Sequence, residues 1–424
     1  MIPHDLVAQA AQVTFSLTDQ FGKVFSVWEL LLRYSPYWAP PVLVVIFARV
    51  WLDYVRMRFI ASQPTVLLEI RLPQEVYKSP ASMQAVFDGL YMRGGETTFI
   101  DRLWLGKLRM WYSFEFVSLE GQVHMYVWVR KSFRKFVERT FYAQYTDIEI
   151  TEAEDYAVKL PFSLERYNLY GMDFALASAV GVPIKTYIDF RLDQSTTKEE
   201  QKTDPIAHVF EFLGSMHKGE YVWIQILARG HKKEDITYGK YHNSKTYEDI
   251  AKEEISRIRK NPEEVIMFPD GGQGKTLSDR QMTRIKAMNR TMLQSTHWDV
   301  GMRGIYLAEH EHFDGTNITG LRTVWQPFGA PGYNSIKSIG NRWQDILDYP
   351  WQDFNGYRDN QKKVQIVDAY RRRSWFHLPY RFPHYMMTSE ELATLFHPPG
   401  SVVRTPNIQR ISSTRAQAPA NLPI

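Results

Sequence analysis

The sequence predicts an α+β protein with an N-terminal membrane helix, a ferredoxin-like βαββαβ domain and a second related α+β sandwich domain. Three observations predict this fold class. A long apolar run lies near the N-terminus, a regular pattern of strands and helices follows it, and a less regular mixture fills the middle of the chain. We expect five segments: an amphipathic segment at 1–36, a membrane-anchoring helix at 37–60, the ferredoxin-like domain at 61–160, the second domain at 161–330 with an insertion at 230–276, and an aromatic and basic arm with an extended tail at 331–424.

Composition excludes several kinds of chemistry. The chain has 424 residues, of which 14% are aromatic and 23% charged, and these values are typical of folded proteins with sizeable cores. The 51 Lys and Arg nearly balance the 47 Asp and Glu, so the net charge of +4 does not by itself indicate nucleic acid. The chain contains no cysteine, which excludes disulfides, thiolate nucleophiles and Cys-ligated metals. We expect no cofactor.

The apolar run at 37–55, "YWAPPVLVVIFARVWLDYV", is the predicted membrane anchor. It approaches the roughly 20 residues that a helix needs to cross a bilayer. Arg56 and Arg58 follow it directly, which favours the inner membrane with the later domains on the cytoplasmic side. The segment 24–35 before it is typical of an interfacial amphipathic helix, and a buried core helix is the alternative for the run itself. The expected anchor residues are Trp38, Val42, Leu43, Val44, Val45, Ile46, Phe47, Arg49 and Trp51.

The first domain is predicted from alternating and helical patterns. Ser79 is placed to cap a helix whose first residue is Pro80, and Glu120-Gly121 marks the turn of a hairpin. Two helices on one face of a four-stranded antiparallel sheet would bury both apolar stripes. The expected elements are a strand at 65–72, a helix at 80–92, a hairpin at 111–131, a helix at 132–145 and a strand at 147–156.

The second domain has a weaker pattern, and we do not expect it to repeat the first one element by element. Asp204 is expected to cap a helix with Pro205 at its first position. The insertion at 230–276 is polar and contains a charged helical stretch. The expected elements are a strand at 183–192, a helix at 204–217, a strand at 220–229, a helix at 278–294, a strand at 297–308 and a helix at 316–327.

The stretch at 265–282, "VIMFPDGGQGKTLSDRQM", is similar to a phosphate-binding P-loop. It ends in Gly274, Lys275 and Thr276, but Pro269 stands where the motif requires its first glycine, and proline offers no N–H to a phosphate. Ser278 with Gln281, and Thr276 with Asp279, form capping boxes that begin the helix after the lysine. A surface turn is therefore the favoured interpretation, and a nucleotide-binding enzyme with a degenerate P-loop at 269–276 is the alternative.

The sequence "EHEHFD" at 309–314 offers a weak candidate for a metal site. Two imidazoles, those of His310 and His312, can lie on one side of an extended segment and bind a metal ion. A third convincing ligand is not visible in the sequence. An exposed polar strand end before a helix is therefore the favoured interpretation.

The segment "YRRRSWFHLPYR" at 370–381 mixes arginines with aromatic side chains. This composition can stack bases and neutralise phosphates, and it can equally face acidic headgroups or an acidic protein. Nucleic acid is therefore possible as a partner but not favoured. The apolar helix near the C-terminus is a second expected partner contact. The expected contact residues are Arg371, Arg372, Arg373, Trp375 and Tyr380 in the basic segment, and Leu392, Leu395 and Phe396 in the helix.

Three stretches carry a resemblance to a known family. They are "LLEIRLPQEVYKSPASMQAVFDGLY" at 67–91, "WYSFEFVSLEGQVHMYVWVRKSFRKFVERTFYAQYTDIEI" at 111–150, and "SEELATLFHPPG" with "APANLPI" within 389–424. Together they resemble an uncharacterised bacterial family of membrane-anchored proteins associated with type IV secretion or conjugation. They are also similar to the region that precedes the motor in HerA/TraG-like secretion ATPases. The resemblance implies a non-enzymatic, oligomeric scaffold in the membrane that works with a separate ATPase.

Overall fold

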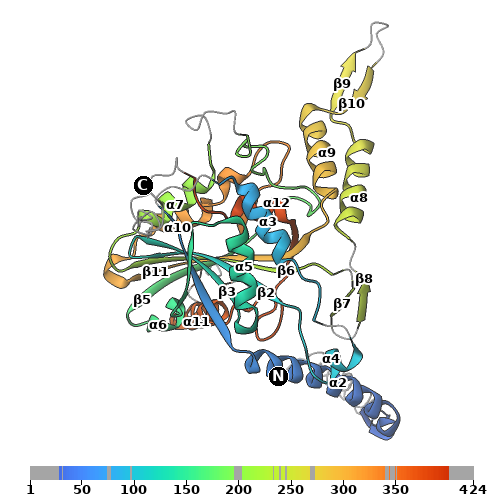
Figure 1. Ribbon diagram of the computed structural model, residues 1–424. Helices are drawn as coiled ribbons and strands as arrows, with labels where there is room; N and C mark the ends of the chain where they lie inside the picture. The colour runs from blue at the N-terminus through green and yellow to red at the C-terminus, as the bar shows by residue number, and fades with distance from the viewer. Residues whose placement is uncertain are drawn as a thin grey trace, which may run out of the picture.

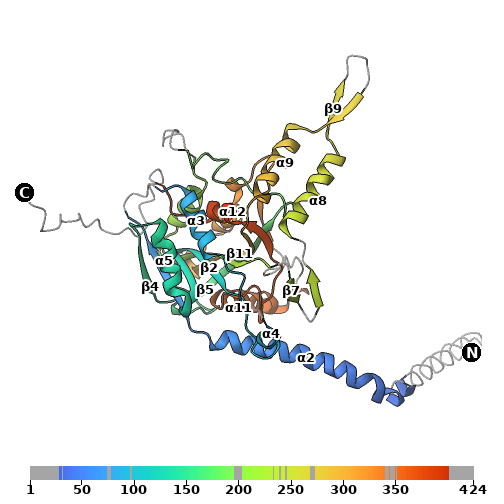
Figure 2. The same cartoon turned by 45° about the vertical axis from the view of Figure 1, so that its right-hand side comes forward.

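The computed structural model shows one antiparallel sheet at the centre of the molecule, with helices on both faces (Figure 1). A long N-terminal helix and an arm that ends in a β-hairpin project from this body (Figure 2). The structure describes residues 28–30, 32–73, 78–95, 98–194, 203–232, 234–237, 240–243, 246–267, 273–339, 343, 349 and 351–400.

The central sheet contains nine strands, and each hydrogen-bonded pair within it is antiparallel. Most of its strands are buried along nearly their whole length, because helices cover both faces. The strand order is β12 (Ile336–Ile339), β5 (Tyr167–Leu176), β11 (His297–Glu309), β6 (Glu220–Gly230), β2 (Trp111–Leu119), β3 (Gln122–Arg130), β1 (Thr65–Arg71) and β4 (Glu149–Ala153), and β13 (Tyr385–Thr388) pairs with the start of β11.

The first half of the sheet contains the elements that the sequence predicts. Its chain order is β1, α3 (Pro80–Leu90), β2, β3, α5 (Arg134–Gln144) and β4, and its spatial order is β2-β3-β1-β4. The Ser79 side chain accepts a hydrogen bond from the N–H of Ala81 and caps α3 as expected. Glu120 and Gly121 both have positive φ, which is the geometry of the tight turn that a two-residue hairpin favours.

The second half begins with a strand that the sequence analysis missed. The predicted strand at 183–192 is wrong, because these residues form turns, and β5 supplies the first strand instead. The turns persist because side chains from elsewhere satisfy their backbone. The N–H of Ile184 donates to the Glu391 carboxylate, and the N–H of Tyr187 donates to the Thr394 hydroxyl. These backbone groups therefore need no partner strand.

With β5 as its first strand, the second half has the same order of strands and helices along the chain as the first half. Its chain order is β5, α7 (Ile206–Gly214), β6, β11, α10 (Thr316–Thr323) and β12, and its spatial order is β12-β5-β11-β6. The expectation that the two halves differ element by element is therefore wrong at the level of strand order. The difference lies in an insertion between β6 and β11.

The two halves share one sheet through β2 and β6. These are the second strands of the two halves, and they pair over nine residue pairs, from Trp111 with Arg229 to Leu119 with Tyr221. On its own, each half would leave β2 or β6 as an exposed edge strand. Because the two strands pair with each other, their backbone N–H and C=O groups are hydrogen-bonded. The α+β units at 61–160 and 161–330 are consequently continuous in space.

Each face of the sheet has its own core. One face packs against α3, α5, α7, α10 and α12 (Ser389–Leu395), and the other packs against α6 (Tyr156–Lys159) and α11 (Tyr357–Arg371) (Figure 1). Alternate residues of one strand enter different cores. Phe114 and Phe116 face the first core, whereas Trp111 and Val117 face the second. This arrangement explains why the strands read as nearly continuous apolar runs.

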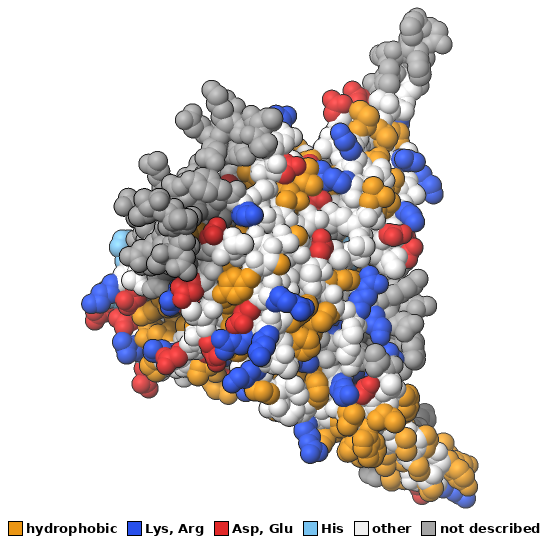
Figure 3. All heavy atoms as spheres, viewed as in Figure 1, with side chains coloured by type: hydrophobic (Ala, Val, Ile, Leu, Met, Phe, Trp, Pro, Cys, Tyr) orange, Lys and Arg blue, Asp and Glu red, His pale blue; other side chains and the backbone are white. Residues whose placement is uncertain are grey.

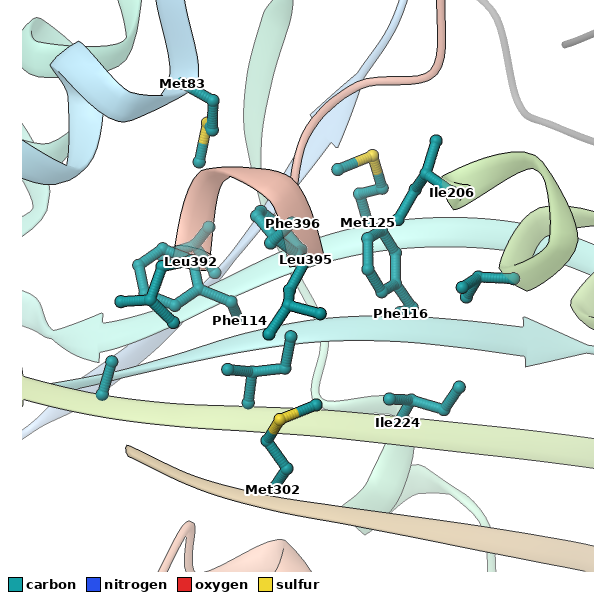
Figure 4. Packing of buried hydrophobic residues seen from close by; sticks show 14 of the residues in the cluster. Met83, Phe114, Phe116, Met125, Ile206, Ile224, Met302, Leu392, Leu395 and Phe396 are labelled. Carbon is teal, nitrogen blue, oxygen red and sulfur yellow. The ribbon is translucent and has the colours of Figure 1, made fainter. Parts of the chain in front are cut away.

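The C-terminal helix α12 lies at the centre of the first core. Leu392 and Leu395 are fully buried, and the ring of Phe396 lies 4.7 Å from that of Phe116 and 5.2 Å from that of Phe114 (Figure 4). Thr388 caps the helix in a capping box with Glu391. Helix α12, late in the chain, therefore completes a core to which the strands and helices of the first half also contribute.

The insertion between β6 and β11 forms an arm on the body. The arm consists of α8 (Tyr247–Lys260), β9 (Glu264–Met267), β10 (Gln273–Thr276) and α9 (Asp279–Met292). The insertion also contains a separate hairpin of β7 (Glu234–Thr237) and β8 (Lys240–Asn243), which lies apart from the arm, on the side from which α2 projects (Figure 1). Helices α8 and α9 pack on each other and share a small apolar cluster with Val182 and Met386 of the body. The hairpin β9–β10 extends beyond their far ends (Figure 1).

Candidate functional site

The most prominent feature of the surface is α2 (Ser35–Ser62), which projects from the body and carries apolar side chains along the face seen in Figure 3. Only 11% of the most apolar 18-residue stretch of this helix is buried inside the structure. The buried residues of the whole helix are Leu52 and Val55. A core helix of a soluble protein would instead be mostly buried. By length and composition, α2 is able to cross a membrane. Among the expected anchor residues, Trp38, Arg49 and 42–47 are exposed and Trp51 is half-buried.

The P-loop-like residues lie in a strand. Gly274, Lys275 and Thr276 belong to β10 and pair with β9 in the projecting hairpin, with Lys275 opposite Val265. Helix α9 begins only at Asp279, and Ser278 and Gln281 form its capping box as predicted. A phosphate cradle requires a loop whose N–H groups converge at a helix N-terminus. Lys275 therefore lies in a strand, apart from the helix N-terminus, and the capping box predicted at Thr276 is wrong, because that residue belongs to β10. Pro269 lies outside the described residues.

The two histidines of the metal candidate have separate partners. Both lie in a short 3-10 helix, His310–His312, after β11. His310 Nε2 lies 3.1 Å from the carbonyl oxygen of Leu164, and His312 Nδ1 lies 3.7 Å from a carboxylate oxygen of Glu309. In the part of the chain that the structure describes, no group of three His, Asp or Glu is arranged to hold a metal ion.

The basic segment is largely part of the interior. Arg371 donates to the carbonyl oxygens of Ala157 and Leu160, and Arg372, which is exposed, pairs with Asp368. Arg373 and Trp375 are each 1% exposed, so neither can contact nucleic acid, lipid or another protein in this conformation. The expected contact role is wrong for these two residues. Tyr380 is half-buried beside the ring of Phe382.

Arg373 is the centre of a buried polar network that the sequence analysis did not predict. Its guanidinium donates to the carboxylates of Glu115, on β2, and of Asp155, before α6. Tyr156 donates to Glu115 and also shares a hydrogen bond with Tyr370. Burial would lower the pKa of Arg373, but the two carboxylates outweigh it and raise that pKa well above its usual value. The arginine therefore stays charged and joins the end of α11 to the first half of the sheet.

A cavity of about 340 Å³ lies between this network and the end of α2. The rings of Trp111 and Trp128 form part of its wall, and the segment 371–379 closes it. The pKa of His377, which also lines it, is held well below its usual range by burial and by nearby arginines. The cavity is thus lined by aromatic rings and by arginines that already have partners.

The apolar C-terminal helix is also internal. Leu392, Leu395 and Phe396 are fully buried in the first core, and their expected role as partner contacts is therefore wrong. Two acidic residues of α12 are buried as well, because Glu390 pairs with Arg290 and Glu391 accepts backbone hydrogen bonds. The tail after residue 400 lies outside the described residues.

Comparison with known proteins adds no relative: no protein-family model matches the chain, and no curated protein matches it. The strongest feature is the exposed apolar helix beside a folded α+β body. The sequence located this helix, because length and hydropathy are local properties, and the buried network was missed, because its members are far apart in the chain.

Proposed function

We propose that the protein is a non-enzymatic, membrane-anchored docking component of a type IV secretion-like or conjugative machine. In this proposal α2 spans the inner membrane, and two ferredoxin-like units form the body on the cytoplasmic side. The strand order and connectivity of each half support the ferredoxin-like interpretation. The resemblance to the region that precedes the motor in HerA/TraG-like secretion ATPases supports a separate secretion-type ATPase as partner, and we expect a homo-oligomeric assembly.

One observation carries the membrane part of the proposal. The exposed side chains of α2 are almost all apolar between residues 37 and 48, and the rest of the body places large apolar side chains mainly in its two cores. Leaving such a helix in water would be costly, at roughly 25 cal/mol for each Å² of apolar surface. A bilayer removes this cost, and Arg56 and Arg58 on the body side of the helix favour a cytoplasmic body.

The membrane part is tested by extraction of native membranes at alkaline pH. We expect the wild-type protein to stay in the pellet and the double variant Val44→Lys, Phe47→Lys to be released, because each lysine costs about 2.5–3.5 kcal/mol at a helix centre in a bilayer. Leu293→Lys, at an exposed position of the arm, is the matched control and should stay in the pellet. Release of the wild-type protein would exclude a spanning helix.

The partner part is tested by crosslinking in native membranes. The arm is the structure's most projecting element after α2, and Met282 on α9 is exposed there. A photoreactive residue at 282 is expected to crosslink to a secretion-type ATPase, whereas one at Val158, exposed on the body, should not. If residue 282 crosslinks only to chains outside that class, the ATPase proposal fails and the membrane anchor is unaffected.

A further inference from the structure

A second apolar surface lies beside the body end of α2. It is formed by the short helix α4 (Phe99–Leu103) and the two residues after it. Four large side chains within seven residues face solvent: Phe99 is 77% exposed, Ile100 64%, Trp104 69% and Leu105 47%. Such a concentration of exposed apolar side chains marks an interaction site.

Helix α4 is held firmly in this position. Thr98 and Asp101 form a capping box at its start, and the Asp101 carboxylate also pairs with Lys107 at 2.8 Å. Gly106 has a φ of 61° and lies against the Val55 carbonyl of α2, so a larger residue there would push the two segments apart. The apolar surface is therefore presented in a fixed orientation.

The α4 surface is continuous with α2. The Nε1 of Trp51 donates to the Leu103 carbonyl at 2.9 Å, and its ring lies 5.4 Å from that of Trp104. Tyr54 adds a third ring, 6.1 Å from Trp51. These three aromatic side chains lie where α2 leaves the body, which is the level at which tryptophan and tyrosine gather in a membrane interface.

We propose that α4 is a second membrane contact, which inserts Phe99, Ile100, Trp104 and Leu105 into the leaflet on the body side. The proposal rests on the proposed function, because it requires α2 to be in the membrane. Helix α4 then lies in the interface next to the spanning helix. Since it is fixed to α2 at Trp51 and Val55, it sets the depth at which α2 sits and the distance between the bilayer and the sheet.

Lipid fits this surface better than a protein partner. A stable protein interface buries about 800 Å² on each side, and four side chains on the short segment formed by α4 and the two residues after it are a small part of such an area. The apolar surface of α4 also continues onto α2, because the ring of Trp104 lies against the ring of Trp51. Lys107 and Arg58 lie near this junction in the chain and suit an anionic headgroup layer.

The test uses single cysteines, which are clean reporters because the chain has none of its own. An environment-sensitive fluorophore is placed in the full chain by Phe99→Cys or Trp104→Cys, with Val44→Cys as the reporter of α2 and Leu293→Cys as the exposed control. The labelled proteins are reconstituted into vesicles of phosphatidylcholine and phosphatidylglycerol. Lipids that carry a nitroxide near the headgroup or deep in the acyl chain then quench the fluorophore according to depth.

We expect residues 99 and 104 to be quenched most by the shallow nitroxide, residue 44 most by the deep one, and residue 293 by neither. Quenching at 44 with water-exposed fluorophores at both 99 and 104 would overturn this inference and leave the proposed function intact. No quenching at 44 would overturn both. Shielding of 99 and 104 without lipid quenching would show a protein contact, such as a second copy, and would also overturn the inference. Both replaced side chains are mostly exposed, so the variants should fold.

Discussion

Arg373 shows how strongly the role of a single residue depends on the fold around it. In the sequence it is one of three consecutive arginines, and their composition suits a phosphate. In the structure the three have different partners: two carbonyl oxygens for Arg371, the exposed Asp368 for Arg372, and two buried carboxylates for Arg373. The partners of Arg373 lie more than 200 residues away in the chain, so no local pattern could have identified them.

Capping residues are the opposite case, because their partners are local. Ser79 and Ser278 were assigned from the residues that follow them within a few positions, and both cap their helices in the structure. Glu390 and Glu391 have distant partners instead. Both lie in the first turn of α12, yet each is 1% exposed and binds residues of the segment 184–186 or of α9. The two serine caps were predictable because their partners are local, whereas the partners of Glu390 and Glu391 lie far away in the chain.

His297 gives a prediction at the same scale. It begins β11, and its ring stacks on Tyr247 with centroids 4.5 Å apart. Burial, with His231 and Arg93 nearby, lowers its pKa to about 4. The folded state therefore binds fewer protons than the unfolded state between about pH 6.5 and 4, and stability is lost as the pH falls through this window. At pH 5 this loss amounts to about 2 kcal/mol.

Replacing His297 by Phe should remove this loss, because Phe keeps the stacking and does not titrate. Among the described residues the Nε2 of His297 has no hydrogen-bond partner, so the change breaks no contact there. The measurement is urea unfolding in detergent at pH 7 and pH 5. We expect the unfolding free energy of the variant to fall less than that of the wild type, by about 2 kcal/mol. His208→Phe controls for an added aromatic ring, and equal pH dependence of wild type and variant would contradict the assignment.

At the scale of elements, periodicity predicted the strands of the first half and failed at the start of the second. The segment 183–192 has apolar residues at strand spacing, but the N–H groups of Ile184 and Tyr187 bind side chains of α12 instead of a neighbouring strand. The true strand, β5, contains Gly171 and Asp173, and both weaken the expected strand pattern. Gly171 is needed there because Ile366 of α11 occupies the space of a side chain. Tertiary contacts therefore explain both why 183–192 is not a strand and why β5 was not predicted.

The placement of α12 leads to a prediction about an element. If this helix is part of the core, Leu392→Ala should lower the free energy of unfolding by about 2–5 kcal/mol, because it leaves a cavity beside α3. Leu293→Ala is the matched control, since that leucine is 88% exposed, and it should change stability very little. The measurement is urea unfolding of the two variants. A Leu392 variant as stable as the control would mean that α12 detaches from the body.

At the scale of the whole molecule, the sequence predicted two α+β units and could not show that they join edge to edge. Pairing between β2 and β6 depends on which strands have unpaired backbone groups at the edge of each half. The hydropathy of the sequence does not show which strands these are. The apolar residues of both strands only require burial on both faces. Fusion of the halves gives a broad, stiff platform between α2 and the arm (Figure 2).

This fusion predicts that the body unfolds as one unit. Ile226 on β6 is fully buried and lies opposite Phe114 of β2, so Ile226→Ala should remove about 2–5 kcal/mol from the joint between the halves. We expect hydrogen exchange to accelerate equally in β1 and β5, the inner strands of the two halves, because they share one cooperative transition. Val158→Ala, at an exposed position, should leave both unchanged. Faster exchange in β5 with unchanged exchange in β1 would show instead that each half unfolds on its own.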